Sequence, residues 1–134
     1  MLTIARWSPA WVHWYRRVFP AYWIFLFLTT HLPNLILKIP LSSDKRAHVI
    51  AFGILAFLFW RFVETFRRPV PPTLVYYAGA VLFLYASLDE YLQQFVGRGT
   101  EWGDWFADLA GIVVVLVALE VRRRRLTRGA QQAA

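Results

Sequence analysis

Residues 74–95, LVYYAGAVLFLYASLDEYLQQF, consist of an apolar run at 74–88 that can be extended past two adjacent acids to Phe95. The run approaches the roughly 20 residues of helix that cross a bilayer. Asp89 and Glu90 follow it directly, and Phe95 makes the segment apolar again beyond them. Ionisable side chains at an apolar boundary are costly, so they indicate a functional site. The stretch therefore predicts a membrane helix that carries part of such a site near one end.

Three further apolar segments, residues 18–32, 47–62 and 105–121, accompany this one. The chain has 134 residues, of which 58% are hydrophobic and 18% aromatic, and its mean hydropathy is +0.42. A soluble domain of this length would carry more charge and fewer apolar runs. We therefore expect an all-α fold, an integral membrane bundle of four transmembrane helices that occupies residues 18–121 of a single domain.

The two ends of the chain differ from the bundle in composition. Residues 1–17 combine tryptophans with arginines, a mixture typical of the headgroup region, so we expect a short interfacial helix that runs into the first crossing. Residues 122–134 begin with four arginines and form a basic cytoplasmic tail, in which we expect the last six residues to lack regular structure.

Basic residues are distributed unevenly between the two predicted faces of the membrane. Eleven of the fifteen lie within residues 1–17, 61–72 and 122–134, whereas the loops around 34–46 and 95–104 hold four. The positive-inside rule then places both termini in the cytoplasm of a multi-pass plasma-membrane protein. Six of the eight acidic residues lie toward the other face. We therefore expect the acidic motifs at the outer face.

The candidate site consists of two acidic motifs, a glycine-flanked arginine turn and two further acids. The motifs are Asp-Lys-x-x-His at 44–48 and Asp-Glu-x-x-Gln at 89–93, and the last two acids share one helix face. The candidate catalytic residues are Asp44, Lys45, His48, Asp89, Glu90, Gln93, Arg98, Asp104 and Asp108. Arg98 and Lys45 would engage an anionic group, and His48 with a carboxylate partner would transfer a proton. We expect helices two, three and four to supply these groups and helix one to supply mostly apolar packing.

Some of these residues also have a structural interpretation. Asp44 is a candidate N-cap of its helix, as are Asp104 and Gly103 of theirs. Asp108 lies too deep for a cap, and Gly111 one turn later marks a position of close helix approach. The polar cluster as a whole is therefore either a binding site or a lock between helices.

In order and spacing, these motifs resemble the VanZ-like family. The resemblance covers about residues 44–111 and rests on Asp-Lys-x-x-His-x-x-x-Phe, Asp-Glu-x-x-Gln, and Gly-Arg followed by an Asp six residues after the Arg. The chain departs from the family pattern at two places. The family usually has Pro-Gly-Arg at the turn, whereas here Val96 directly precedes Gly-Arg and the segment is one residue short. Position 108 is Asp, where Asn is frequent in the family. The resemblance implies a small membrane protein of the cell envelope, whose name-giving members are associated with resistance to teicoplanin-type glycopeptide antibiotics. It implies no settled reaction.

Four functions fit the sequence. The first is an envelope protein that binds or acts on an anionic, lipid-linked or cell-wall intermediate at the outer leaflet. The others are a metal-dependent membrane enzyme that uses His48 and the carboxylates, a proton-coupled carrier, and a non-catalytic membrane scaffold. Whether the protein is an enzyme, and whether it uses a metal, stays open at this stage.

Composition narrows the partners. The chain has no cysteine, which excludes thiolate metal sites and a thiol nucleophile. Its net charge of +7 is concentrated beside the apolar segments instead of forming a free basic face, which argues against nucleic acid. The expected partners are the lipid bilayer and the lipid-linked or cell-wall ligand.

Overall fold

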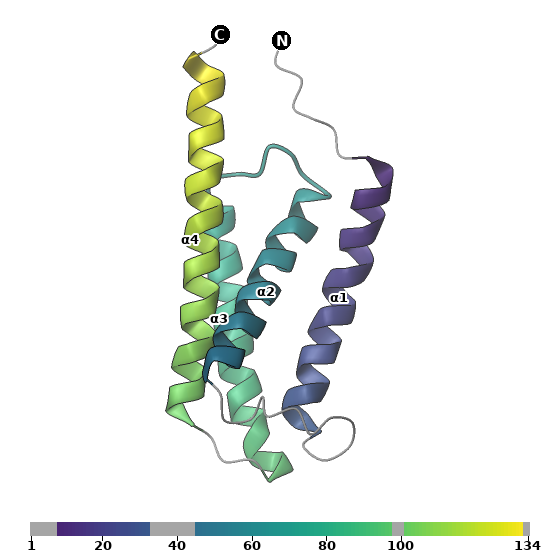
Figure 1. Cartoon of the computed structure of the whole chain (residues 1–134), viewed down its shortest axis with the longest axis vertical. Coiled ribbons are helices and arrows are strands. Elements are labelled where there is room, and N and C mark those ends of the chain that lie inside the picture. The colour runs from purple at the N-terminus through teal and green to yellow at the C-terminus, as the bar shows by residue number, and fades with distance from the viewer. Residues whose placement is uncertain (1–7, 33–44, 98–100, 133–134) are drawn as a thin grey trace.

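The fold is all-helical in the part of the chain that the computed structural model describes, residues 8–32, 45–97 and 101–132. Four helices follow one another (Figure 1): α1 (Pro9–His31), α2 (Lys45–Glu64), α3 (Leu74–Gln93) and α4 (Trp102–Gln132). The short 3₁₀ helix η2 (Gln94–Val96) extends α3. These ranges contain no strand. The predicted all-α fold class is confirmed at this level.

The direction of the helices brings four helix ends together. α1 and α3 run one way along the bundle, and α2 and α4 run the other way (Figure 1). The C-terminal ends of α1 and α3 therefore lie at the same end as the N-terminal ends of α2 and α4. Asp89 and Glu90 near the end of α3 lie at this end, as do Asp104 and Asp108 near the start of α4, so we call it the acidic end of the bundle.

The closest approach in the bundle is between α2 and α4, which share the most extensive interface. Gly111 makes it possible, because a Cβ atom at this position would collide with the backbone carbonyl of Val49. Gly53 faces Gly111 from α2, with Val115 beside it. The close approach that the sequence predicts at Gly111 is confirmed.

The apolar core lies between these helices. Phe52 and Leu55 of α2 and Leu82 of α3 are almost fully buried, and Trp60 packs with them. Tyr22 of α1 donates a hydrogen bond to the Ala51 carbonyl oxygen over 2.9 Å, which attaches α1 to α2.

The N-terminal lead is part of the first helix. α1 starts at Pro9 and continues to His31 without interruption, although Pro20 lies inside it. Trp11 and Trp14 are exposed and make an edge-to-face contact with one another. The described part of the lead therefore forms the first turns of α1 and runs directly into the rest of that helix, as expected.

The basic tail is also helical. α4 continues to Gln132, so the expectation that the last six residues lack regular structure is wrong for residues 129–132. Glu120 accepts hydrogen bonds from Arg123 and Arg124 over 2.7 Å, three and four residues further along, a spacing that stabilises helices. The same contact raises the pKa of the Arg123 guanidinium. Arg, Leu, Ala and Gln in this segment also favour the helix.

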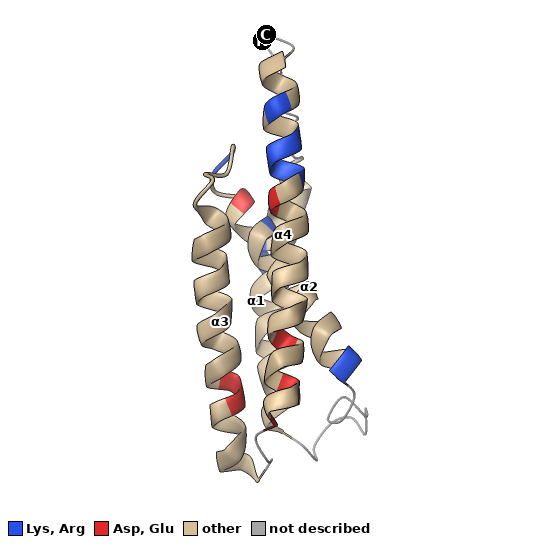
Figure 2. Cartoon of the chain, turned by 90° about the vertical axis from the view of Figure 1, so that its left-hand side faces the viewer, with Lys and Arg blue, Asp and Glu red and all other residues tan. Residues whose placement is uncertain are grey.

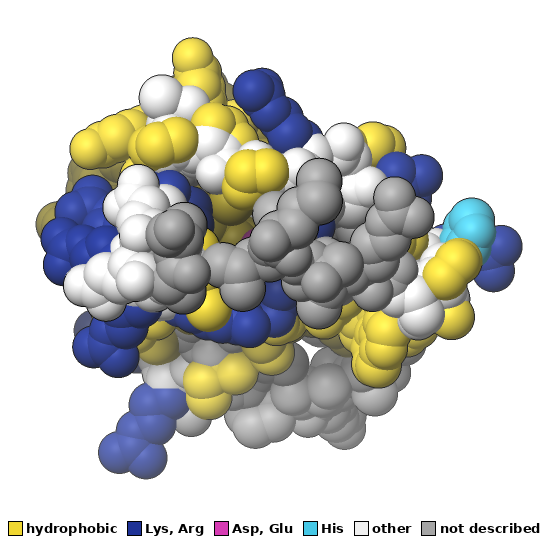
Figure 3. All heavy atoms as spheres, turned by 90° about the horizontal axis from the view of Figure 1, so that it is seen from above, with side chains coloured by type: hydrophobic (Ala, Val, Ile, Leu, Met, Phe, Trp, Pro, Cys, Tyr) yellow, Lys and Arg dark blue, Asp and Glu magenta, His cyan; other side chains and the backbone are white. Residues whose placement is uncertain are grey.

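Charge separates along the bundle. Figure 2 shows the acids of α3 and most acids of α4 near the end opposite to the arginines of α4, whereas Glu120 pairs with those arginines. Basic side chains gather at the other end of the bundle, where α4 finishes (Figure 3). There Glu64 accepts hydrogen bonds from Arg61 and Arg68 over 2.8 and 3.2 Å.

Large apolar side chains are exposed along all four helices. Among them are Ile24, Phe25, Ile50, Ile54, Tyr76, Leu84, Leu88, Phe106, Val113 and Val114. By length and composition, α2 is nevertheless the one helix of the described ranges that is apolar enough to cross a membrane. α4, for comparison, carries Asp104, Asp108 and Glu120 within its length.

Candidate functional site

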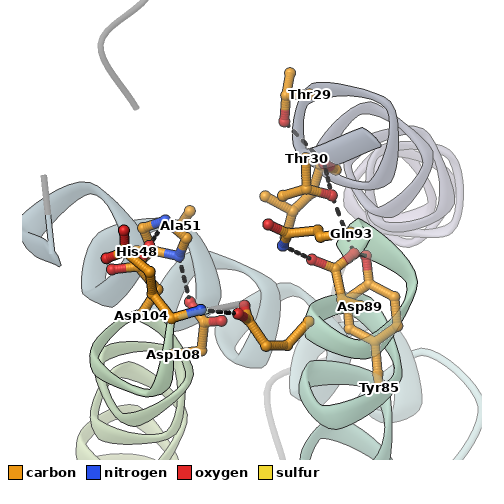
Figure 4. A network of polar contacts seen from close by, with 12 residues as sticks. Thr29, Thr30, His48, Ala51, Tyr85, Asp89, Gln93, Asp104 and Asp108 are labelled. Carbon is orange, nitrogen blue, oxygen red and sulfur yellow. Dashed lines mark hydrogen bonds and ion pairs between the residues drawn. The ribbon is translucent and has the colours of Figure 1, made fainter. Parts of the chain in front are cut away.

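The centre of the site is a histidine held between two carboxylates (Figure 4). His48 of α2 places Nδ1 2.9 Å from Oδ1 of Asp108 and Nε2 3.6 Å from Oδ2 of Asp104. The two aspartates are one turn apart on α4, so a single imidazole reaches both. The three residues are buried, and Asp108 is only 1% exposed. We call them the His48 triad. The prediction that Asp104 and Asp108 share one face is confirmed.

The triad has the geometry for proton exchange. A proton on Nδ1 of His48 is donated to Asp108, which leaves Nε2 directed toward Asp104. If Nε2 also takes a proton, both carboxylates stabilise the resulting imidazolium. Oδ1 of Asp104 is buried and has no hydrogen-bond partner among the described residues.

A second group of contacts surrounds Asp89 of α3 (Figure 4). Its Oδ1 accepts hydrogen bonds from the Thr30 and Tyr85 hydroxyl groups over 3.0 and 3.3 Å, and its Oδ2 accepts one from Gln93 Nε2 over 3.1 Å. Asp89 is 1% exposed. It lies near the C-terminal end of α3, where the helix dipole disfavours an anion, so these donors compensate. We call these four residues the Asp89 network.

Helix one contributes more polar contacts than the sequence predicts. Thr30 binds Asp89, and the Nδ1 atom of the buried His31 lies 2.9 Å from the Thr30 hydroxyl and 3.7 Å from Asp89. The expectation that this helix supplies mostly apolar packing is therefore wrong at its C-terminal end. Three successive polar residues, Thr29 to His31, close an apolar segment at the predicted outer face, and this signal could have identified them.

Glu90 connects α3 to the start of α4. Its Oε1 accepts a hydrogen bond from the backbone N–H of Glu101 over 2.6 Å. One turn further into the bundle, Trp105 donates to the Ser87 hydroxyl over 3.2 Å. A carboxylate at this place satisfies a free N–H group beside the positive end of the α4 dipole. Glu90 therefore acts as a capping group from a neighbouring helix.

The two residues predicted to cap α4 lie inside the helix. The helix begins at Trp102, so Gly103 and Asp104 lie in its first turn instead of before it. The backbone N–H of Asp104 donates to the Glu101 carbonyl over 2.9 Å, and the side chain is left to face His48. Asp104 thus belongs to the His48 triad.

The predicted cations are only partly described. Lys45 is the first residue of α2 and is exposed, and its ammonium group lies close to Gly103 at the start of α4. Asp44 and Arg98 fall outside the described residues. The predicted turn before Arg98 is confirmed at Gly97, whose φ of 76° is left-handed and favours glycine.

The described ranges show no group of three or more His, Asp or Glu residues arranged to hold a metal ion.

The contacts divide the predicted site into three parts. These are the His48 triad between α2 and α4, the Asp89 network between α1 and α3, and Glu90 between them.

Comparison with known proteins gives one match. The VanZ/LLP1 family model matches residues 3–123, which include every candidate residue and nearly the whole chain. No curated protein matches the chain, and no solved structure does.

Proposed function

The chain belongs to the VanZ/LLP1 family, and we propose that it is a multi-pass plasma-membrane protein that binds an anionic, lipid-linked or cell-wall intermediate at the outer face. The site is the acidic end of the bundle. The His48 triad would contact the ligand, while the Asp89 network holds the helices in place around it.

Burial supports the membrane part of this proposal. Asp89 and Asp108 are each 1% exposed, whereas Leu84 of α3 and Val114 of α4 are each 66% exposed. A protein in water hides its large apolar side chains and exposes its carboxylates. The reverse arrangement suits lipid around the bundle and polar groups inside it. The four helices would then all cross the bilayer, α1, α3 and α4 by burying their polar groups against one another.

Helix direction and charge support the orientation. α1 begins and α4 ends at the same end of the bundle (Figure 1), as an even number of crossings requires. That end carries the arginines of α4 (Figure 2). By the positive-inside rule it would face the cytoplasm, and the acidic end would face outward.

One observation carries the ligand-binding part. Oδ1 of Asp104 is buried without a hydrogen-bond partner among the described residues, beside a histidine nitrogen 3.6 Å from the other oxygen of the same carboxylate. An unsatisfied buried acceptor costs about 1–3 kcal/mol. A hydroxyl or amide donor of a ligand would satisfy it, and His48 would accept or return a proton.

Positive groups at the same end would hold the anionic part of the ligand. The N-terminal end of α2 points there (Figure 1), and helix N-termini attract anions. Lys45 adds a charge at the start of α2. Arg98 would add a two-pronged contact to a phosphate or carboxylate.

The scaffold function is favoured for the Asp89 network alone. Both oxygens of Asp89 have donors from the protein itself, so the carboxylate is hydrogen-bonded without a ligand. Its contacts join α1 to α3. The Asp89 network would therefore stabilise the bundle, and the His48 triad would bind.

The test is His48→Gln, with His13→Gln as the matched control. His13 lies in α1 near the opposite end and is exposed. We expect His48→Gln to abolish the effect of the protein on susceptibility to a teicoplanin-type glycopeptide while the purified protein stays folded. His13→Gln should leave both unchanged. Retention of the phenotype by folded His48→Gln protein would overturn the binding role.

A further inference from the structure

An open apolar groove of about 360 Å³ lies along the crossing of α2 and α4. Ile50, Ile54 and Phe57 line it from α2, and Val114 and Val115 line it from α4. Gly53 and Gly111 also line it, and they let the two helix backbones approach closely at the crossing. The groove is exposed at Ile50, Ile54 and Val114, at 61%, 42% and 66%.

The residues that line the groove begin just after those of the His48 triad along both helices. Val49, which also lines it, directly follows His48, and Gly111 lies one turn beyond Asp108. From there the groove runs along α2 toward Phe57, which is about 10 Å of helix from Ile50. A molecule seated in the groove thus has one end beside the triad and the other toward the middle of the bundle.

Charge marks the end of the groove near the triad. Lys45 and Arg46 are exposed in the first turn of α2. Arg46 precedes Ile50 by four residues, so both lie on the same face of the helix. The positive end of the helix dipole at this helix start also favours an anion. The surface therefore changes from apolar to cationic within about one turn.

We propose that this groove binds the hydrocarbon chain of an anionic, single-chain lipid, with its phosphate beside Lys45 and Arg46. The inference rests on the proposed function and narrows its ligand to the lipid-linked class. The chain lies against Ile50, Ile54 and Val114, and the headgroup reaches the His48 triad. The buried carboxylates then face the hydroxyl or amide donors of the headgroup, and the exposed cations face the phosphate.

Photochemical cross-linking tests this assignment. The probe is dodecyl phosphate with a diazirine near the end of its chain, added to the full-length protein in phosphatidylcholine nanodiscs. The neutral control is the corresponding dodecanol. We expect the phosphate probe to label residues 50–57 and 111–115 in preference to other exposed apolar faces, such as that of Leu84, and the alcohol to label them more weakly.

Two matched variants place the label in the groove. Val114→Trp fills the groove and should lower its labelling about tenfold, which corresponds to ~1.4 kcal/mol. Val113→Trp makes the same change at the next residue, which is 57% exposed and does not line the groove. It should leave the labelling unchanged. Thermal unfolding of both variants shows whether they keep the fold. If either variant loses the fold, the labelling of the native protein by the two probes decides whether the groove is the site.

Each other outcome overturns the assignment. Even labelling of all exposed apolar faces removes the groove as a site. Equal labelling by the alcohol removes the phosphate contact, and cross-links between two copies of the chain make the groove a protein interface. If the groove is not labelled but His48→Gln loses the phenotype, the proposed function stands without the lipid. If the groove is labelled but folded His48→Gln keeps the phenotype, the proposed function falls and the groove is a lipid site outside it.

Discussion

At the scale of single residues, the two buried aspartates differ in what holds them. Asp89 has donors on both oxygens, all from side chains of α1 and α3. Asp108 has its contact with His48, made through one oxygen. An amide group retains one acceptor oxygen but replaces the other with a donor. The same Asp→Asn change therefore has different consequences at the two positions.

We expect Asp89→Asn to destabilise the protein by about 1–3 kcal/mol, because one of its present donors would face the new NH₂ group. Asp108→Asn should cost less, since its remaining oxygen can still accept from His48, and Asn is frequent at this position in the family it resembles. Thermal unfolding of both variants in one detergent measures the difference. Equal loss at the two positions would contradict the division between network and triad.

Arg98 separates ligand binding from charge compensation. If it grips a planar anionic group with two nitrogens, Arg98→Lys should abolish the effect on glycopeptide susceptibility, because lysine cannot form that contact. If it only neutralises carboxylates, lysine should keep much of the effect. We expect the phenotype to be lost before stability, as measured by parallel susceptibility and unfolding assays. Loss of both in parallel would favour the scaffold.

At the scale of helices, the crossing of α2 and α4 positions the triad. His48 comes from one helix and both of its carboxylates from the other, so a shift between the helices would separate them. The glycine at 111 allows their short distance, because a Cβ atom at this position would collide with the Val49 carbonyl. A larger residue at 111 would therefore disturb both the packing of α2 against α4 and the contacts of His48 with its two aspartates.

Gly111→Ala should push α2 and α4 apart and cost about 1–3 kcal/mol, the usual penalty of overpacking. Gly129→Ala is the matched control, since nothing lies within 4 Å of a Cβ atom at that helical position. There alanine should be neutral or stabilise by up to ~1 kcal/mol. Unfolding curves of the two variants provide the comparison. A neutral Gly111→Ala would mean that the helices can separate without cost.

The sequence predicts the helices better than their ends and partners. Apolar runs at 47–62 and 74–88 lie inside α2 and α3, because a helix that buries polar groups continues past its apolar part. The spacing of Asp104 and Asp108 predicts their shared face. The polar run at 29–31 indicates Thr30 and His31 as candidates, but it does not reveal that they contact Asp89. Contacts between helices depend on packing, which local spacing does not encode.

At the scale of the whole molecule, the two ends of the bundle have opposite character. One end holds the His48 triad, the Asp89 network and Glu90, and the other holds the arginines of α4 together with Glu64 (Figure 2). The apolar faces between them belong to all four helices. Such a molecule would have one orientation in a bilayer, with its site at one surface.

Cysteine labelling tests that orientation, and the absence of native cysteine makes it a clean measurement. Ser43→Cys and Thr100→Cys lie next to the predicted outer motifs, and Thr127→Cys lies in the basic part of α4. With eleven of fifteen basic residues on the other side, an impermeant thiol reagent added to intact cells should label the first two and not the third. Permeabilised cells should show all three sites labelled, which controls for access. Labelling of Thr127→Cys alone in intact cells would place the acidic end in the cytoplasm, and an outer-leaflet ligand would then have no access to His48.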